Sequence, residues 1–158
     1  PENLYDLARA LHAGGRTRDA RVAFEEFERA ARTERDRADN ANHELVYYYV
    51  DYARRPAAAA AVAAAELRRR RDVRTLEACG WALAATGQLR AARACIDDAI
   101  AVGIRDAELY YRAGNIARRQ GDANAARGLL RESLAINPRA ASAPRARREL
   151  RALERHAP

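Results

Sequence analysis

The sequence lacks the features that mark membrane proteins, disulfide-rich domains and collagen-like chains. Its longest apolar stretch, residues 56–67, is mostly Ala and falls short of the roughly 18 residues that a transmembrane helix needs. Two Cys are too few for a disulfide framework, and eight Gly exclude a collagen-like repeat. Methionine is absent, and aromatic residues make up only 6% of the chain. We therefore expect a soluble domain whose core contains few bulky side chains.

Alanine and arginine dominate what is present. About a quarter of the 158 residues are Ala, which favours helices over strands. All 29 basic residues are Arg, and with 22 acidic residues they give a net charge of +7. GC-rich coding also produces this Ala and Arg excess, so the charge is only a weak indication of a nucleic-acid or acidic partner. The composition predicts an all-α fold.

A pattern repeated every 34 residues is the clearest feature of the chain. Apolar and small residues near 107–140 recur at 73–106 and again at 39–72. A fourth copy at 1–34 is offset by 38 residues, because about four extra residues lie near 35–38. Each copy has two stretches of helical periodicity separated by a turn. One helix pair cannot bury its own apolar face, so the pairs must stack as a single domain over residues 1–158.

The last copy resembles the tetratricopeptide repeat (TPR) family. The matching residues of that copy are Tyr110, Gly114, Gly121, Asp122, Ala126, Leu130 and Pro138. The first three copies depart from the family pattern because they lack the closing Pro, and Asn42 stands where a large apolar residue is usual. The resemblance implies a right-handed α-solenoid of four helix pairs. It would be completed by a C-terminal capping helix near 142–156.

Small residues are expected where the two helices of each pair meet. The second helices carry one Ala column, and the first helices present small residues or Val opposite it; the expected positions are Ala20, Ala58, Ala92, Ala126, Ala8, Val46, Gly80 and Gly114. Gly15, Gly87 and Gly121 fall where the first helices should end with a positive φ. In the cap, Ser142 is a suitable N-cap, and Leu150 and Leu153 share an apolar face. A basic helix for nucleic acid or a membrane surface is the alternative for that segment.

No catalytic, cofactor-binding or metal-binding motif is present in the sequence, so we expect neither an enzyme nor a cofactor. Cys79 and Cys95 lie on the inward columns of one helix pair. They are interpreted as small buried hydrophobes, with a redox-sensitive pair as the alternative. The arginines at 68–71 end a helix, where cations complement the dipole; a nucleic-acid patch is the alternative.

The family resemblance implies that the first helices line a concave groove for a peptide or protein segment. Carried over position by position, the expected groove residues are Tyr5, Arg9, His12, His43, Tyr47, Asp51, Glu77, Trp81, Tyr111, Arg112, Asn115 and Arg118. Trp81, Tyr47 and Tyr111 are predicted to form a continuous binding stripe, because Trp and Tyr often dominate binding energy. The alternative is that Trp81 and Tyr47 fill space between repeats.

These observations predict a non-enzymatic protein-interaction scaffold. Its partner would be a segment with apolar anchors and some acidic residues. A basic α-solenoid that binds nucleic acid through phosphates is the alternative function. A carboxylate clamp of the kind found in one TPR subtype is not expected, because Arg74, Arg112 and Asn115 stand in the wrong combination. The sequence leaves the oligomeric state undetermined and favours a cytoplasmic location only weakly.

Overall fold

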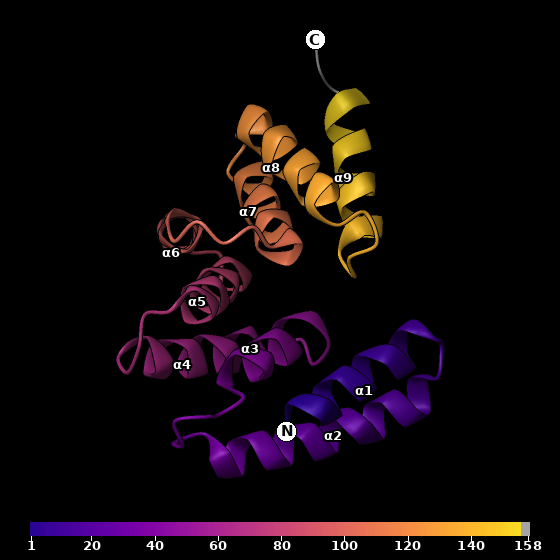
Figure 1. The fold of residues 1–158 in the computed structure, drawn as a ribbon, viewed down its shortest axis with the longest axis vertical. Helices are drawn as coiled ribbons and strands as arrows, with labels where there is room; N and C mark the ends of the chain where they lie inside the picture. The colour runs from indigo at the N-terminus through magenta and orange to yellow at the C-terminus, as the bar shows by residue number, and fades with distance from the viewer. Residues whose placement is uncertain (156–158) are drawn as a thin grey trace.

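The structure is a computed structural model, and it describes residues 1–155. Over this range the chain is all-α, as predicted, with no strand (Figure 1). The helices are α1 (Glu2–Ala13), α2 (Thr17–Glu34), α3 (Asn42–Asp51), α4 (Pro56–Leu67), α5 (Val73–Ala85), α6 (Leu89–Ala101), α7 (Ala107–Arg119), α8 (Ala123–Ile136) and α9 (Ala143–Arg155). None of them combines the length and the apolar character that a bilayer crossing requires.

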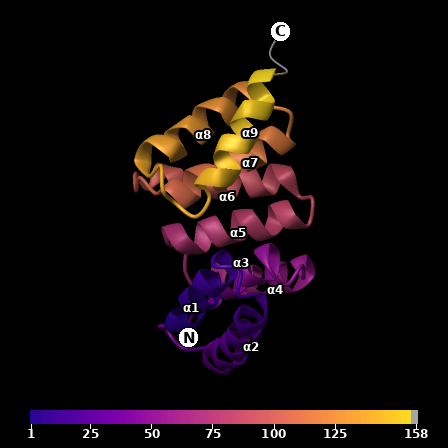
Figure 2. The same ribbon diagram turned by 90° about the vertical axis from the view of Figure 1, so that its right-hand side faces the viewer.

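Consecutive helices pack against one another and build up along the long axis of the molecule. Figure 2 shows α3, α5 and α7 in successive layers, with the first pair at one end and α9 at the other. The helix α9 packs on α8, in the place predicted for the cap. Residue 156, at which the predicted cap would end, lies outside the described residues.

The α5–α6 and α7–α8 pairs are held together by contacts at glycine. A Cβ atom built on Gly80 would lie 2.6 Å from a side-chain carbon of Ile96, and one built on Gly114 would lie 2.8 Å from Leu130. The Ala residues opposite, Ala92 and Ala126, are fully buried. The predicted small-residue column is thus confirmed in these two pairs, where it lets the backbones approach closely.

In α4 the predicted position of this column is wrong by one residue. Ala58 is only partly buried there, whereas Ala59, Ala63 and Glu66 face inward. The cause is the turn at 52–55, which is one residue longer than the turns at 86–88 and 120–122. Arg54 takes a positive φ of 56° in this turn, two residues before the second helix, where the other pairs place Gly15, Gly87 and Gly121.

A buried polar cluster around Glu66 holds the extra residues between the first and second pairs. The Glu66 carboxylate accepts hydrogen bonds from Asn40 at 3.3 Å and from Asn42 at 2.7 Å. Arg69 donates to the backbone carbonyls of residues 35, 36 and 37, and Arg70 donates to that of residue 38. These two arginines of the run at 68–71 therefore have a structural role, although they hold a loop rather than only ending a helix.

Aromatic rings fill the junction between α2 and α3. Phe24 stacks on Tyr48 with ring centroids 5.0 Å apart, and Phe27 meets the same ring edge-on at 6.0 Å. The hydroxyl of Tyr49 donates to Glu28 at 2.9 Å. Seven of the ten aromatic residues lie in the first two helix pairs, so bulky side chains contribute most at this end of the molecule.

Glu149 links the capping helix to α7. Its carboxylate accepts hydrogen bonds from the Tyr111 hydroxyl at 3.2 Å, the Asn115 amide at 2.9 Å and the Arg118 guanidinium at 3.0 Å. Ser142 precedes α9 as predicted, but its hydroxyl has no hydrogen-bond partner among the described residues. Its backbone N–H donates instead to Glu108 of α7 at 2.9 Å. Side chains of α7 that were expected to be free for a partner are therefore bound to α9.

Replacing Gly114 by Ala should lower the free energy of unfolding by about 1–3 kcal/mol, because the new methyl group overlaps Leu130. Gly128 in α8 is the matched control, since a Cβ there meets nothing within 4 Å. Gly128→Ala should raise stability by about 0.5–1 kcal/mol through helix propensity. Urea unfolding measures both variants, and a Gly114→Ala protein as stable as the parent would refute the close approach.

Replacing Glu149 by Ala should loosen the cap and cost about 1–3 kcal/mol, because three donors lose a shared acceptor. Hydrogen exchange at the α9 amides should then become faster, while exchange in α5 and α6 stays unchanged. Glu154→Ala serves as the control: it breaks the exposed pair with Arg131 and should cost less than about 0.5 kcal/mol. Equal exchange in the two variants would contradict an anchoring role for Glu149.

Candidate functional site

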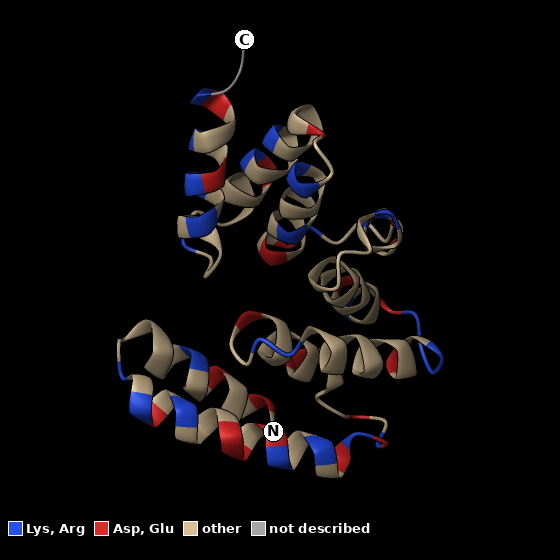
Figure 3. Ribbon diagram, turned by 180° about the vertical axis from the view of Figure 1, so that it is seen from behind, with Lys and Arg blue, Asp and Glu red and all other residues tan. Residues whose placement is uncertain are grey.

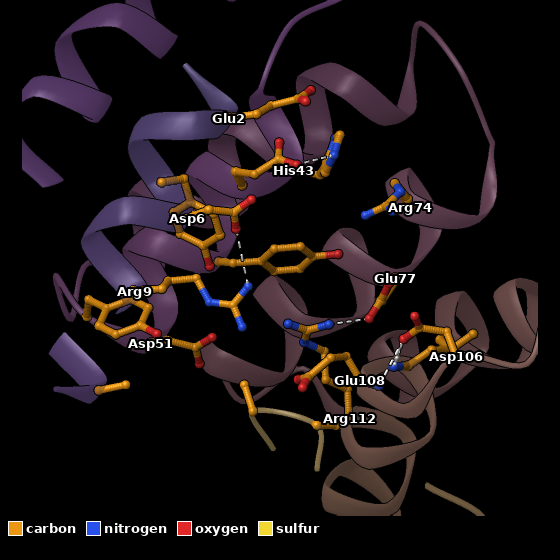
Figure 4. Close-up of a pocket in the computed structure, with 18 of the residues that line it drawn as sticks. Glu2, Asp6, Arg9, His43, Asp51, Arg74, Glu77, Asp106, Glu108 and Arg112 are labelled. Atoms are coloured by element: carbon orange, nitrogen blue, oxygen red, sulfur yellow. Dashed lines mark hydrogen bonds and ion pairs between the residues drawn. The ribbon is translucent and has the colours of Figure 1, made fainter. Parts of the chain in front are cut away.

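A deep groove of about 1360 Å³ runs along the first helices of the pairs. It is lined along the length of α1 and α3, by the N-terminal parts of α5 and α7, and by the segment that leads into α9. The side chains of these elements converge from several sides in Figure 4. Because α1, α3, α5 and α7 stack as successive layers, the groove brings together residues more than 100 positions apart in the sequence.

Eight of the twelve residues predicted for the groove line it. They are Tyr5, Arg9, His12, His43, Tyr47, Asp51, Glu77 and Arg112. The other four, Trp81, Tyr111, Asn115 and Arg118, lie outside this lining. The last three of these contact Glu149, so the cap covers the part of α7 that was expected to be open.

The aromatic stripe predicted for ligand contact is buried. Trp81 is 8% exposed, Tyr47 6% and Tyr111 3%, and the Trp81 and Tyr111 rings pack with centroids 6.4 Å apart. The expectation of an open stripe is therefore wrong, and the alternative that Trp81 and Tyr47 fill space between repeats matches this packing. The reason is the stacking itself: a column repeated every 34 residues falls between neighbouring first helices when those helices pack side by side.

A buried ion pair lies at the floor of the groove. The Arg112 guanidinium contacts the Glu77 carboxylate, sits 4.0 Å from the centroid of the Tyr47 ring and lies 5.8 Å from that of Trp81. Burial alone would lower the pKa of Arg112, but the charge of Glu77 and smaller contributions from other nearby acidic groups together outweigh it and keep that pKa well above its usual value. Arg112 is thus a fixed positive charge, and removing Glu77 would leave it uncompensated.

The side chain of Tyr47 presents an unpaired polar atom beside this ion pair. Its hydroxyl oxygen is buried and has no hydrogen-bond partner among the described residues. Burial, followed by the charge of Glu77, raises the pKa of Tyr47 well above its usual value, so the phenol stays protonated. The groove floor therefore holds a hydroxyl that can both donate and accept.

Most of the acidic groups of the groove already have partners. Asp51 accepts from the Trp81 indole at 3.1 Å, and Asp6 pairs with Arg9 at 3.7 Å. The remaining contacts join His43 to Glu44, Asp106 to the first amides of α7, and Glu108 to the amide of residue 142. These contacts orient the carboxylates, but the donors to Asp51, Asp106 and Glu108 are neutral, so these three side chains keep their negative charge.

Two arginines of the groove have no partner for their side chains. The side chains of Arg74 and Arg139 line it and form no ion pair or hydrogen bond within residues 1–155. Arg74 projects from the start of α5 in Figure 4, and Glu2 is the corresponding unpaired carboxylate on α1. Arg74 was not among the predicted groove residues. The repeat could have indicated it, since positions 2, 74 and 108 occupy one column of the pattern and all three line the groove.

The chemistry available is recognition by charge, hydrogen bonding and shape. Among the described residues, no group of three or more His, Cys, Asp or Glu side chains could hold a metal ion. The exposed Ile104, in the segment before α7, adds an apolar contact next to these polar groups. Such an arrangement suits a polypeptide, whose backbone supplies donors and acceptors and whose side chains supply charge and apolar groups.

Comparison with known proteins gives a family match for the α7–α8 region. The profile of the tetratricopeptide repeat family matches residues 107–139. Among solved structures, the type III secretion translocator chaperone SycD of Yersinia enterocolitica is similar at 16% identity and a TM-score of 0.49. That alignment covers 97% of this chain and 82% of the other. A search of the curated proteins finds no match. The chain therefore contains a segment that matches the tetratricopeptide repeat, and α7 and α8 form that segment.

Proposed function

We propose that this chain is a non-enzymatic protein-interaction scaffold that holds a polypeptide segment in its concave groove. The observation that supports this proposal most directly is the groove, which is one continuous surface formed by the first helices. Unpaired cations and an exposed apolar side chain lie on that surface. The family match supports a protein partner, because the resemblance to TPR proteins implies peptide or protein ligands in this groove.

The partner segment carries acidic groups. Charge that is already paired inside the protein contributes little to a new ligand, whereas Arg74 and Arg139 can form charge-assisted hydrogen bonds with carboxylates. Arg145 on α9 also lines the groove, with its guanidinium 5.1 Å from the centroid of the Tyr111 ring. These arginines lie where α5 and α9 begin, so acidic residues of the segment would bind along that side of the groove.

The segment also carries an apolar anchor. Ile104 is 49% exposed and lines the groove in the segment that leads into α7. Val73, the first residue of α5, lines the groove as well and is half-buried. An aliphatic or aromatic side chain of the partner placed between them would remove apolar surface from water on both molecules.

The distribution of charge favours a protein partner over nucleic acid. Figure 3 shows Lys/Arg and Asp/Glu positions interleaved along α2 and α9 rather than gathered on separate faces. In the arginine run at 68–71, Arg69 and Arg70 hold the loop at 35–38, which supports a structural role for these two residues over a phosphate-binding one.

Selection from a display library of random peptides tests the proposal. The selected peptides should be enriched in acidic residues flanking an apolar one. Arg74→Ala should weaken their binding about tenfold, the effect of losing one charge-assisted hydrogen bond. Arg90→Ala is the matched control, because Arg90 is also exposed but lies on α6, outside the groove. Fluorescence anisotropy gives the dissociation constants.

Three outcomes would count against parts of this proposal. Peptides that bind both variants as tightly as the parent would contradict the role of Arg74. Selected peptides without acidic residues would contradict the chemistry assigned to the partner. Absence of any peptide binder, together with capture of a single-stranded oligonucleotide whose affinity falls by orders of magnitude between about 50 and 200 mM salt, would favour the nucleic-acid alternative.

A further inference from the structure

We propose that Cys95 and Cys79 form a thiol oxidation site, in which Cys95 reacts with a hydroperoxide and Cys79 closes a disulfide between α5 and α6. This inference is independent of the groove and of what binds there. It starts from a contact that the two helices of one pair bring about: the sulfur atoms of Cys79 and Cys95 lie 3.0 Å apart. Both residues are free thiols in the structure.

The close contact follows from the packing next to it. Cys79 precedes Gly80 and Cys95 precedes Ile96, and the Ile96 side chain packs directly against the backbone of Gly80. The thiols therefore lie on rigid helices beside a tightly packed contact, and little movement is needed to bring them to disulfide distance. The last pair has Ala113 and Leu129 at the equivalent positions, so the fold does not need sulfur there.

The two sulfur atoms are not equivalent. Cys79 is 4% exposed, whereas Cys95 is partly open to solvent. The hydrogen bond from Cys79 lowers the pKa of Cys95 to about 7, against burial and the charge of Asp98, which act in the opposite direction; Arg71 acts with the hydrogen bond. The same hydrogen bond and burial raise the pKa of Cys79. Near neutral pH, Cys95 is therefore the accessible thiolate and Cys79 the protonated partner.

The chemistry needs only a hydroperoxide as the oxidant. The Cys95 thiolate attacks one peroxide oxygen and the O–O bond breaks; with hydrogen peroxide, the other oxygen takes up a proton and leaves as water, so that Cys95 becomes a sulfenic acid. The Cys79 sulfur then attacks the Cys95 sulfur, and the hydroxyl group leaves with the Cys79 proton as a second water. Two thiols are oxidised by two electrons, and one peroxide is reduced.

Hydrogen peroxide added to the protein in stoichiometric amount at pH 7 is the probe. We expect both thiols to disappear together, the intact mass to fall by about 2 Da as two hydrogens are lost, and tryptic peptides 75–90 and 94–105 to become linked. The thermal midpoint should rise, because the bridge restricts the unfolded chain. Dithiothreitol should reverse all of these changes. Oxidation of Cys95 without linkage, or linkage only between molecules, would overturn the proposal.

Two variants separate the roles of the thiols. Cys79→Ala introduces the residue that the last pair has at this position. In this variant, oxidation of Cys95 should stop at a sulfenic acid that dimedone traps. The midpoint of Cys95 alkylation against pH should also move up from about 7. In Cys95→Ala, the remaining buried thiol should react at least roughly tenfold more slowly. Equal reactivity of the two variants, or an unchanged midpoint in Cys79→Ala, would refute the assignment. Circular dichroism confirms that both variants are folded.

Discussion

The distance between the two helices of a pair is the constraint on which the rest of this structure depends. At Gly80 and Gly114 the first helix has no side chain where Ile96 and Leu130 of the second helix press against it. This approach gives an Ala-rich chain a dense core without many large side chains. The close approach also leaves the opposite faces of the first helices to form the groove. Next to the Gly80 contact, it brings the thiols of Cys79 and Cys95 together.

The groove draws its rigidity from the same helices that make the core. Arg112 and Glu77 are buried as a pair against the Tyr47 ring, so their charges are held in place before any partner arrives. Residues that face neighbouring helices fix this floor, while Arg74 and Arg139 at the edge remain available. The buried floor is already ordered and adds no entropy cost on binding, whereas the side chains of Arg74 and Arg139 would have to be ordered by a partner.

The sequence predicts local features well because they depend on spacing alone. The 34-residue period, the turn glycines and the small residues of the last two pairs can all be read from residue types. The register of α4 could not be predicted from the sequence, since it depends on one additional residue in a turn where Arg54 takes the place of glycine. The burial of Trp81 could not either. Whether a residue between two stacked helices faces a neighbour or solvent depends on the angle between repeats, which the period does not encode.

The polar cluster at Glu66 has a consequence for the aperture of the groove. The helix α1 forms one wall, the beginnings of α5, α7 and α9 supply residues from the other side, and the chain between them passes through the loop at 35–41. Asn40, Asn42 and Arg69 fix that loop to the end of α4, so together with the aromatic contacts between α2 and α3 they help to set the position of the first helix pair. The width of the groove therefore depends on residues that lie outside it. A change in the length of the loop at 35–41 would widen or narrow the groove without altering its lining residues.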